Sequence, residues 1–274
     1  MVSINEALKF LEESLKDVTD EAINEARIIV SYLAEEEPAR LILSNKKVDL
    51  KAIKKIINRR RKGEPLQYIL GKWWFFDSEF YVGRGVLIPR QDTETLVDTA
   101  LELISSKENL AVADLCAGSG AIGISLAAKR PNITVTAVEK YPKAFKYLKQ
   151  NIELNKTTNV KPVKTDVLKK PFGLYDIIVS NPPYITKTDM NDLSREVKKE
   201  PRTALLGGEE GLDFYKAISA NWKSALKKGG KLIFEIGIGQ AEAVGEILKN
   251  EGFSEITVIK DLGGVQRVIF GTLN

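Results

Sequence analysis

Four consecutive residues, Asn181-Pro182-Pro183-Tyr184, provide an amide, two prolines and an aromatic ring. They follow the apolar run Tyr175–Val179 after a single residue, Ser180. The run predicts a buried strand, which the prolines end. Because proline holds the residue before it in an extended conformation, we expect the Asn181 side-chain oxygen and the Pro182 carbonyl oxygen to form a rigid pair of acceptors. Such a pair suits the two in-plane hydrogens of an –NH2 group, on which Tyr184 can stack. The segment therefore predicts recognition of an amide or aromatic amine, with an ordinary polar loop as the alternative.

A second candidate is the glycine-rich turn Asp114-Leu115-Cys116-Ala117-Gly118-Ser119-Gly120-Ala121-Ile122-Gly123, which follows a predicted strand and begins a helix. Glycines 118 and 120 let a ligand approach the backbone, and Gly123 lets the helix pack closely on the strand. Glu139 ends the next strand, about 20 residues further on, where a carboxylate can bind both hydroxyls of an adenosine ribose. This pattern predicts an adenosine-containing cofactor and by itself fits both NAD and S-adenosylmethionine.

Three features favour S-adenosylmethionine. Asp114, at the end of its strand, can bind a cationic amino group but would repel a pyrophosphate. The chain contains no histidine, so no acid–base residue for hydride transfer is evident, although a tyrosine or lysine could serve. The Asn181 segment is suited to bind an amine or amide group, and it offers no catalytic group of the kind that acts beside a nicotinamide. An NAD-dependent reductase is the alternative, and competition between the two cofactors for binding distinguishes them.

These residues need a sheet that brings them together. From residue 110 onward, apolar strands alternate with amphipathic helices, which predicts an α/β doubly wound sheet with one antiparallel edge. We predict strands at 111–115, 134–138, 160–164, 177–180, 231–235, 256–259 and 265–270, helices at 121–129, 142–155, 213–226 and 241–250, and a hairpin turn at 261–264.

The residues before this sheet predict two further parts. Helical spacing of apolar residues from 4 to 62 predicts a small bundle, with Asp20 capping its second helix and Pro38 opening the third. An aromatic block over 73–81 predicts a hairpin linker. Pro89 and Arg90 then follow an apolar strand and are candidates for the wall of a ligand pocket, with Asp92 as the next helix cap. The predicted domains are 1–64, 65–90 and 91–274.

Composition limits the chemistry. Of the 274 residues, 43% are apolar and 28% are charged, which is ordinary for a globular protein. One cysteine, Cys116, and no histidine exclude a disulfide and the common transition-metal sites, so we expect no metal. The absence of a long apolar run and of a signal peptide predicts a cytoplasmic protein without a membrane partner. The basic run Lys46–Lys62 is either a solvated helix face or a surface for nucleic acid.

Together, Asp114–Ile122, Glu139 and the Asn181 segment resemble class I methyltransferases that act on nitrogen. A wider set resembles the HemK/PrmC family, the glutamine N5-methyltransferases of peptide chain release factors. That set comprises residues 63–71, 89–94, 200–212, 235–237 with Gln240, and 261–267. The resemblance runs from about residue 63 to the end, and the bundle agrees only in size and position. The family's Gly-Thr is Cys116-Ala117 here and its Pro-Arg-Pro ends in Gln91, from which we expect altered affinity and retained activity.

The resemblance implies a helical domain that helps to dock a release factor, a hairpin linker, and a Rossmann-like domain that methylates the glutamine of the factor's Gly-Gly-Gln motif. The substrate amide would contact Asn181, Pro182, Pro183 and Tyr184, with Asn181 and Pro182 as catalytic acceptors. The expected cofactor-binding residues are Pro89, Arg90, Asp114, Cys116, Ala117, Gly118, Ser119, Gly120, Glu139, Val167 and Asn181.

Three alternatives stay open at this point. The first is a related enzyme that methylates a glutamine of a ribosomal protein. The second is a nucleic-acid methyltransferase acting on adenine N6 or guanine N2, which present the same flat –NH2 group to the Asn181 segment; the Lys46–Lys62 run would then bind phosphates. The third is a non-catalytic cofactor-binding or adaptor protein, against which the intact Asn181-Pro182-Pro183-Tyr184 segment argues.

Overall fold

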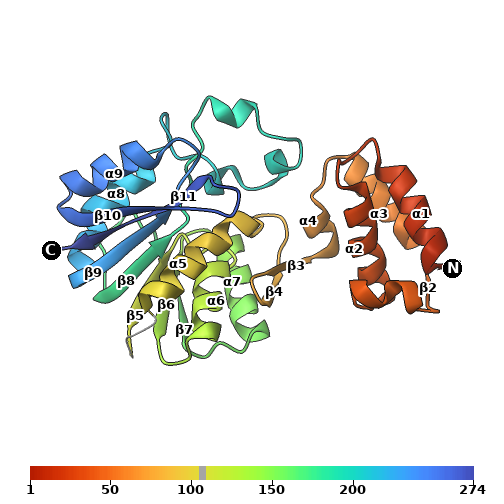
Figure 1. Ribbon diagram of the computed structural model, residues 1–274, viewed down its shortest axis with the longest axis horizontal. Coiled ribbons are helices and arrows are strands. Elements are labelled where there is room, and N and C mark those ends of the chain that lie inside the picture. Colours follow the sequence, from red (N-terminus) through yellow and green to blue (C-terminus); the bar gives the residue numbers. More distant parts are fainter. Residues whose placement is uncertain (105–108) are drawn as a thin grey trace. The chain divides into compact units, whose positions relative to one another are not determined.

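A computed structural model describes residues 1–104 and 109–274 (Figure 1). The chain forms two compact units: the first comprises residues 1–71 and 194–199, and the second comprises residues 72–193 and 200–274. The short segment 194–199 therefore belongs to the first unit although its neighbours in sequence belong to the second. The predicted domain boundaries at 64 and 90 stay a prediction.

The first unit is a helical bundle with an apolar core of its own. Its elements are β1 (Val2–Ser3), α1 (Ile4–Leu15), α2 (Ala22–Ala34), a 3₁₀ helix (Pro38–Leu43), β2 (Lys47–Val48), which pairs with β1, α3 (Leu50–Arg61) and α4 (Leu66–Leu70). The predicted bundle and the opening role of Pro38 are confirmed. The cap at Asp20 is wrong, because Glu21 is the N-cap residue of α2 and its N–H donates to the Thr19 hydroxyl at 3.2 Å.

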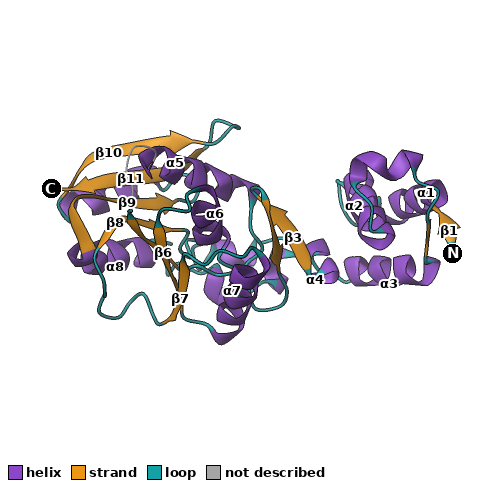
Figure 2. Ribbon diagram, turned by 90° about the horizontal axis from the view of Figure 1, so that it is seen from below, coloured by secondary structure: helices purple, strands orange, loops and turns teal. Residues whose placement is uncertain are grey.

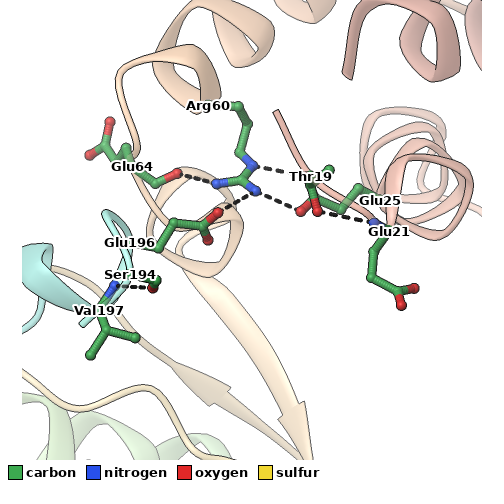
Figure 3. Close-up of polar contacts among 8 residues, drawn as sticks. All are labelled: Thr19, Glu21, Glu25, Arg60, Glu64, Ser194, Glu196 and Val197. Carbon is green, nitrogen blue, oxygen red and sulfur yellow. Dashed lines mark hydrogen bonds and ion pairs between the residues drawn. The ribbon is translucent and has the colours of Figure 1, made fainter. Parts of the chain in front are cut away.

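Arg60, near the end of α3, is buried at the centre of a polar cluster (Figure 3). Its guanidinium donates to the Glu25 carboxylate at 2.8 and 2.6 Å, to the Glu64 carbonyl oxygen at 2.7 Å and to the Glu196 carboxylate at 2.8 Å. The ion pair between Glu196 and Arg60 connects the segment 194–199 to the helices of this unit. The interpretation of the basic run Lys46–Lys62 as a solvated helix face is therefore wrong at Arg60. This side chain is buried and its guanidinium donates four hydrogen bonds within the protein.

The second unit contains a seven-stranded sheet in the order β10-β11-β9-β8-β5-β6-β7. The strands are β5 (Ala111–Leu115), β6 (Thr134–Glu139), β7 (Val160–Lys164), β8 (Tyr175–Ser180), β9 (Leu226–Glu235), β10 (Phe253–Lys260) and β11 (Gln266–Leu273). Strand β11 is antiparallel to β9 and β10, while the other neighbours are parallel, which confirms the predicted doubly wound sheet with one antiparallel edge. The chain order reverses between β5 and β8, so a ligand crevice is expected at their carboxyl ends.

Helices cover both faces of this sheet (Figures 1 and 2). They are α5 (Glu94–Ile104), α6 (Ala121–Lys129), α7 (Pro142–Leu154), α8 (Asp213–Trp222) and α9 (Ala241–Asn250). Because side chains alternate along a strand, Val112 of β5 packs with the core under α5, α6 and α7, and Ala113 packs with the core under α8 and α9. The predicted helix 213–226 was too long, since Leu226 pairs with Tyr175 and belongs to β9.

Two features lead into the sheet. Strands β3 (Lys72–Phe75) and β4 (Ser78–Tyr81) form the predicted antiparallel hairpin. The predicted cap at Asp92 is wrong: this residue lies inside a 3₁₀ turn, Gln91–Thr93, that precedes α5. Its carboxylate instead forms an ion pair with Arg267 of β11 at 3.0 Å, so a tertiary contact has overridden a local preference.

Among the described residues, no helix combines the length and the apolar character that crossing a membrane requires.

Candidate active site

A pocket opens at the carboxyl ends of β5, β6 and β8 within the second unit. The empty space within it is about 970 Å³, which includes space open to solvent. Nine of the predicted cofactor residues line it: Pro89, Arg90, Cys116, Ala117, Gly118, Ser119, Glu139, Val167 and Asn181. The structure thus brings together residues that the sequence spreads over much of the chain.

Glu139, the last residue of β6, joins two sides of the pocket. Its Oε2 accepts from the Gly118 N–H at 2.9 Å and its Oε1 accepts from the Tyr141 N–H at 2.6 Å. Burial raises the pKa of this carboxyl, and the backbone donors counteract the rise. Each oxygen keeps a second lone pair, so the carboxylate can hold the glycine-rich turn in place and also accept from hydroxyl groups of a ligand.

Asp114 does not line the pocket. Its side chain is completely buried beneath the turn, where Oδ2 accepts from the Gly123 N–H at 2.9 Å and Oδ1 has no partner among the described residues. Burial raises the pKa of this carboxyl to about 7. A methyl group on Gly123 would lie 2.8 Å from Oδ2, which explains the glycine there. This packing favours a supporting role for Asp114 over the direct cofactor contact that the sequence suggested.

Two other residues of the turn have left-handed backbone conformations. Gly120, the N-cap of α6, has φ 85° and is absent from the pocket lining, so its predicted cofactor contact is not seen. Cys116 has φ 61°, which costs a residue with a side chain about 1–2 kcal/mol. Burial raises the pKa of the Cys116 thiol, which therefore stays protonated near neutral pH.

The Asn181 segment begins where β8 ends. Asn181 and Pro183 line the pocket, whereas Pro182 and Tyr184 are absent from its lining. The Asn181 amide nitrogen donates to the Thr93 hydroxyl at 3.2 Å, which directs the other end of the amide, its oxygen, away from Thr93. Tyr184 packs against the core under α8 and α9, and its carbonyl oxygen accepts from Gln240 at 3.1 Å. The stacking role of Tyr184 and the paired acceptors stay predictions.

The loop after the Asn181 segment supplies a further wall. Pro201, Thr203 and Ala204 line the pocket. The buried Glu200 carboxylate accepts from the Ile88 N–H at 2.9 Å and forms an ion pair with Arg90. Glu200 therefore holds the residues on either side of Pro89, and in this way it fixes the wall that Pro89 and Arg90 form.

Sequence reasoning missed four polar residues at or beside this site: Thr93, Asp166, Glu200 and Glu235. Asp166 precedes the predicted Val167, and Thr93, Glu200 and Glu235 belong to motifs used for the resemblance. The sequence did not indicate that Glu235 is the neighbour of Asn181, which follows from the pairing of Ser180 with Phe234.

Comparisons with known proteins match both parts of the chain to described families. The family described as "Methyltransferase small domain" matches residues 92–260, and the family described as "PrmC N-terminal domain" matches residues 6–71. A release factor glutamine methyltransferase of Clostridium acetobutylicum is 39% identical over 278 residues, covering 98% of each chain. One of Thermodesulfovibrio yellowstonii is 40% identical over 256 residues, covering 90% of this chain and 91% of its own.

Among solved structures, the chain is similar to a release-factor-specific protein-(glutamine-N5) methyltransferase from Alicyclobacillus acidocaldarius. The two are 30% identical with a TM-score of 0.44, and the match covers 71% of this chain and 99% of the other.

Proposed function

Because the chain belongs to the HemK/PrmC family, we propose that it transfers a methyl group from S-adenosylmethionine to a glutamine of peptide chain release factors. The acceptor would be the side-chain amide nitrogen, N5, of the glutamine in the Gly-Gly-Gln motif. The names of its curated relatives support this substrate. The observation that carries the proposal is the position of Asn181, at the end of β8 and in the same pocket as Gly118 and Glu139.

The pocket residues fit S-adenosylmethionine, which supplies an electrophilic methyl group on a sulfonium when it is bound. The turn at Gly118 leaves room for a ligand beside the backbone, and the Glu139 carboxylate suits the ribose hydroxyls. Ile122, Val138 and Val167 provide apolar lining for a flat base. Asp114 would act indirectly, by holding the Gly123 backbone and hence the turn.

The substrate chemistry explains why an acceptor pair is needed. An amide nitrogen is a poor nucleophile because its lone pair is delocalised into the carbonyl group. Hydrogen bonds donated by the two N–H groups of the substrate amide to the Asn181 oxygen and the Pro182 carbonyl oxygen would increase the electron density on its nitrogen. They would also fix the direction in which that nitrogen points. Positioning and preorganised dipoles then supply most of the rate. S-adenosylhomocysteine would be the product of the cofactor, and no strong base is required because the methylated amide cation is acidic enough to release its proton readily. A chain without histidine can perform this chemistry.

We assign the parts of the chain as follows. Residues 1–64 help to dock the release factor, residues 65–90 link the domains, and residues 91–274 carry out the transfer. The exposed lysines of α3, Lys51, Lys54 and Lys55, are available to an acidic protein surface. Nucleic acid is not needed as a substrate in this scheme, although a basic helix can contact it.

The test is mass spectrometry of a recombinant release factor after incubation with the protein and S-adenosylmethionine. We expect one added methyl group, mapped by fragmentation to the glutamine of the Gly-Gly-Gln motif. A factor with that glutamine replaced by glutamate is the control and should gain none. Parallel reactions contain ribosomal proteins or an adenine- and guanine-containing oligonucleotide. Methylation of one of these, with the release factor left unmodified, would overturn the proposal in favour of that substrate.

A further inference from the structure

A buried carboxyl group beside Asn181 has no part in the scheme above. Glu235 is the last residue of β9, and its side chain is 1% exposed. Its Oε2 has no hydrogen-bond partner among the described residues. Since an isolated buried carboxylate is costly, the presence of this one at the Asn181 segment calls for an explanation.

Three side chains meet at this point: Asn181, Thr93 and Glu235. The Asn181 amide nitrogen donates to the Thr93 hydroxyl oxygen at 3.2 Å. Glu235 is the neighbour of Asn181 in the sheet, because Ser180 pairs with Phe234. The Thr93 and Asn181 side chains lie close enough to lower the pKa of the Glu235 carboxyl by hydrogen bonding. Thr93 is itself only 4% exposed, so its hydroxyl hydrogen has to find a partner in the protein rather than in bulk water.

The donor and acceptor rules then allow one orientation of the Asn181 amide. An ionised carboxylate only accepts, so it takes hydrogens from the Thr93 hydroxyl and from the Asn181 nitrogen. The Thr93 oxygen is left as an acceptor for that same nitrogen. If the amide were turned over, the Asn181 oxygen would face the Glu235 carboxylate and the Thr93 hydroxyl. The single Thr93 hydrogen could then bond only one of these two acceptors, and the other contact would lack a hydrogen.

We propose that Glu235, acting with Thr93, is a positioning residue that fixes the Asn181 side chain so that its oxygen faces the substrate amide. This inference rests on the proposed function and adds to it the groups that orient the catalytic acceptor. Because the Asn181 oxygen is half of the acceptor pair, an amide free to turn over would present a donor to the substrate –NH2 for part of the time.

The charge state of Glu235 decides whether the orientation holds. Burial raises its pKa to about 7, while hydrogen bonds from Thr93 and Asn181 and the Arg267 cation counteract the rise and Asp92 adds to it. Tyr184 and Tyr215 are the other titratable groups beside it, and burial raises the pKa of both phenols. Below neutral pH the protonated carboxyl can donate to the Asn181 oxygen, so the orientation is lost as pH falls.

Three variants test this inference with a release factor and S-adenosylmethionine both saturating. Glu235→Gln carries an amide that can donate to the Asn181 oxygen, so we expect kcat to fall about 10- to 100-fold, as for a misplaced catalytic group. Thr93→Val removes the hydroxyl and should cause a similar fall. Thr93→Ser keeps the hydroxyl and should turn over about tenfold faster than Thr93→Val. The dissociation constant of S-adenosylmethionine, measured by calorimetry, should change much less than kcat.

The pH profile separates positioning from a merely structural effect. Wild-type kcat should rise with pH through about 7, and this step should be absent in Glu235→Gln. Asp114 also has a pKa of about 7, so the step is assigned to Glu235 only if it disappears in Glu235→Gln. A wild-type protein that methylates no glutamine refutes the proposed function itself. An active wild type with unchanged kcat in Glu235→Gln, or equal kcat in Thr93→Val and Thr93→Ser, refutes only this inference. If Glu235→Gln does not fold, the Thr93 pair decides.

Discussion

Replacement of Arg60 by methionine should destabilise the helical unit strongly. Arg60 is 1% exposed and donates to Glu25, whose side chain is 12% exposed, and to Glu196 and the Glu64 carbonyl oxygen (Figure 3). Methionine keeps the apolar stem but removes every one of these donors. The Glu25 carboxylate is then left buried and unpaired, for which the expected loss is about 3–5 kcal/mol in the free energy of unfolding.

Arg40→Met is the control, since it removes the same kind of side chain from the same unit. Its guanidinium lies 3.3 Å from the Glu37 carboxylate, and both side chains are 71% exposed. An ion pair at that level of exposure contributes about 0–1 kcal/mol. A second variant, Arg60→Met with Glu25→Met, removes both charges and should recover about 2 kcal/mol or more of the loss, because the buried carboxylate is gone.

The assay is urea denaturation combined with hydrogen exchange of the amides of α2 and α3. Exchange is needed because a chain with two compact units need not unfold in a single step. We expect faster exchange in these helices for Arg60→Met, with little change in the strands of the large sheet. The reasoning is refuted if Arg60→Met loses no more stability than Arg40→Met, or if the double variant is less stable than Arg60→Met alone.

Two further predictions concern the pocket. Glu139→Ala should weaken S-adenosylmethionine binding by about 1.5–3 kcal/mol, since charge-assisted hydrogen bonds are lost, and unchanged affinity in calorimetry would move the ribose contact elsewhere. Asp114 has a pKa of about 7 in the folded protein, above the value of about 3.9 expected in the unfolded chain, so the folded state retains a proton that the unfolded state has lost. Its contribution therefore makes wild-type stability fall as pH rises from about 4 to about 7, and Asp114→Asn should make the profile flatter; an equally steep profile would contradict this.

Residues at the ends of buried strands could be predicted well from sequence. Glu139 and Asn181 each follow a short apolar run, and parallel strands place their carboxyl ends at one edge of the sheet. The turn at Gly118 could be predicted equally well, because its glycines mark places where the backbone turns tightly or a ligand comes close to it. These are local signals. The fold class could be predicted as well, because apolar strands alternate with amphipathic helices along the chain.

The sequence could not indicate what depends on contacts between distant segments. Asp92 has the residue type of a helix cap, yet it forms an ion pair with Arg267. Asp114 stands at a strand end like Glu139, but it points beneath the turn, where Gly123 leaves room for it. Glu196 joins the helical unit through a buried arginine, and a basic run gives no sign of which of its members will be buried.

The central claim is that the Asn181 oxygen holds and activates the substrate amide beside the cofactor. The rate of methyl transfer to a release factor by Asn181→Ala, with both substrates saturating, tests it most directly. We expect kcat to fall by about 100- to 1000-fold, the effect of losing one preorganised hydrogen-bonding group, while S-adenosylmethionine binding is weakened but detectable by calorimetry. A variant that binds the cofactor and turns over at nearly the wild-type rate would contradict the claim.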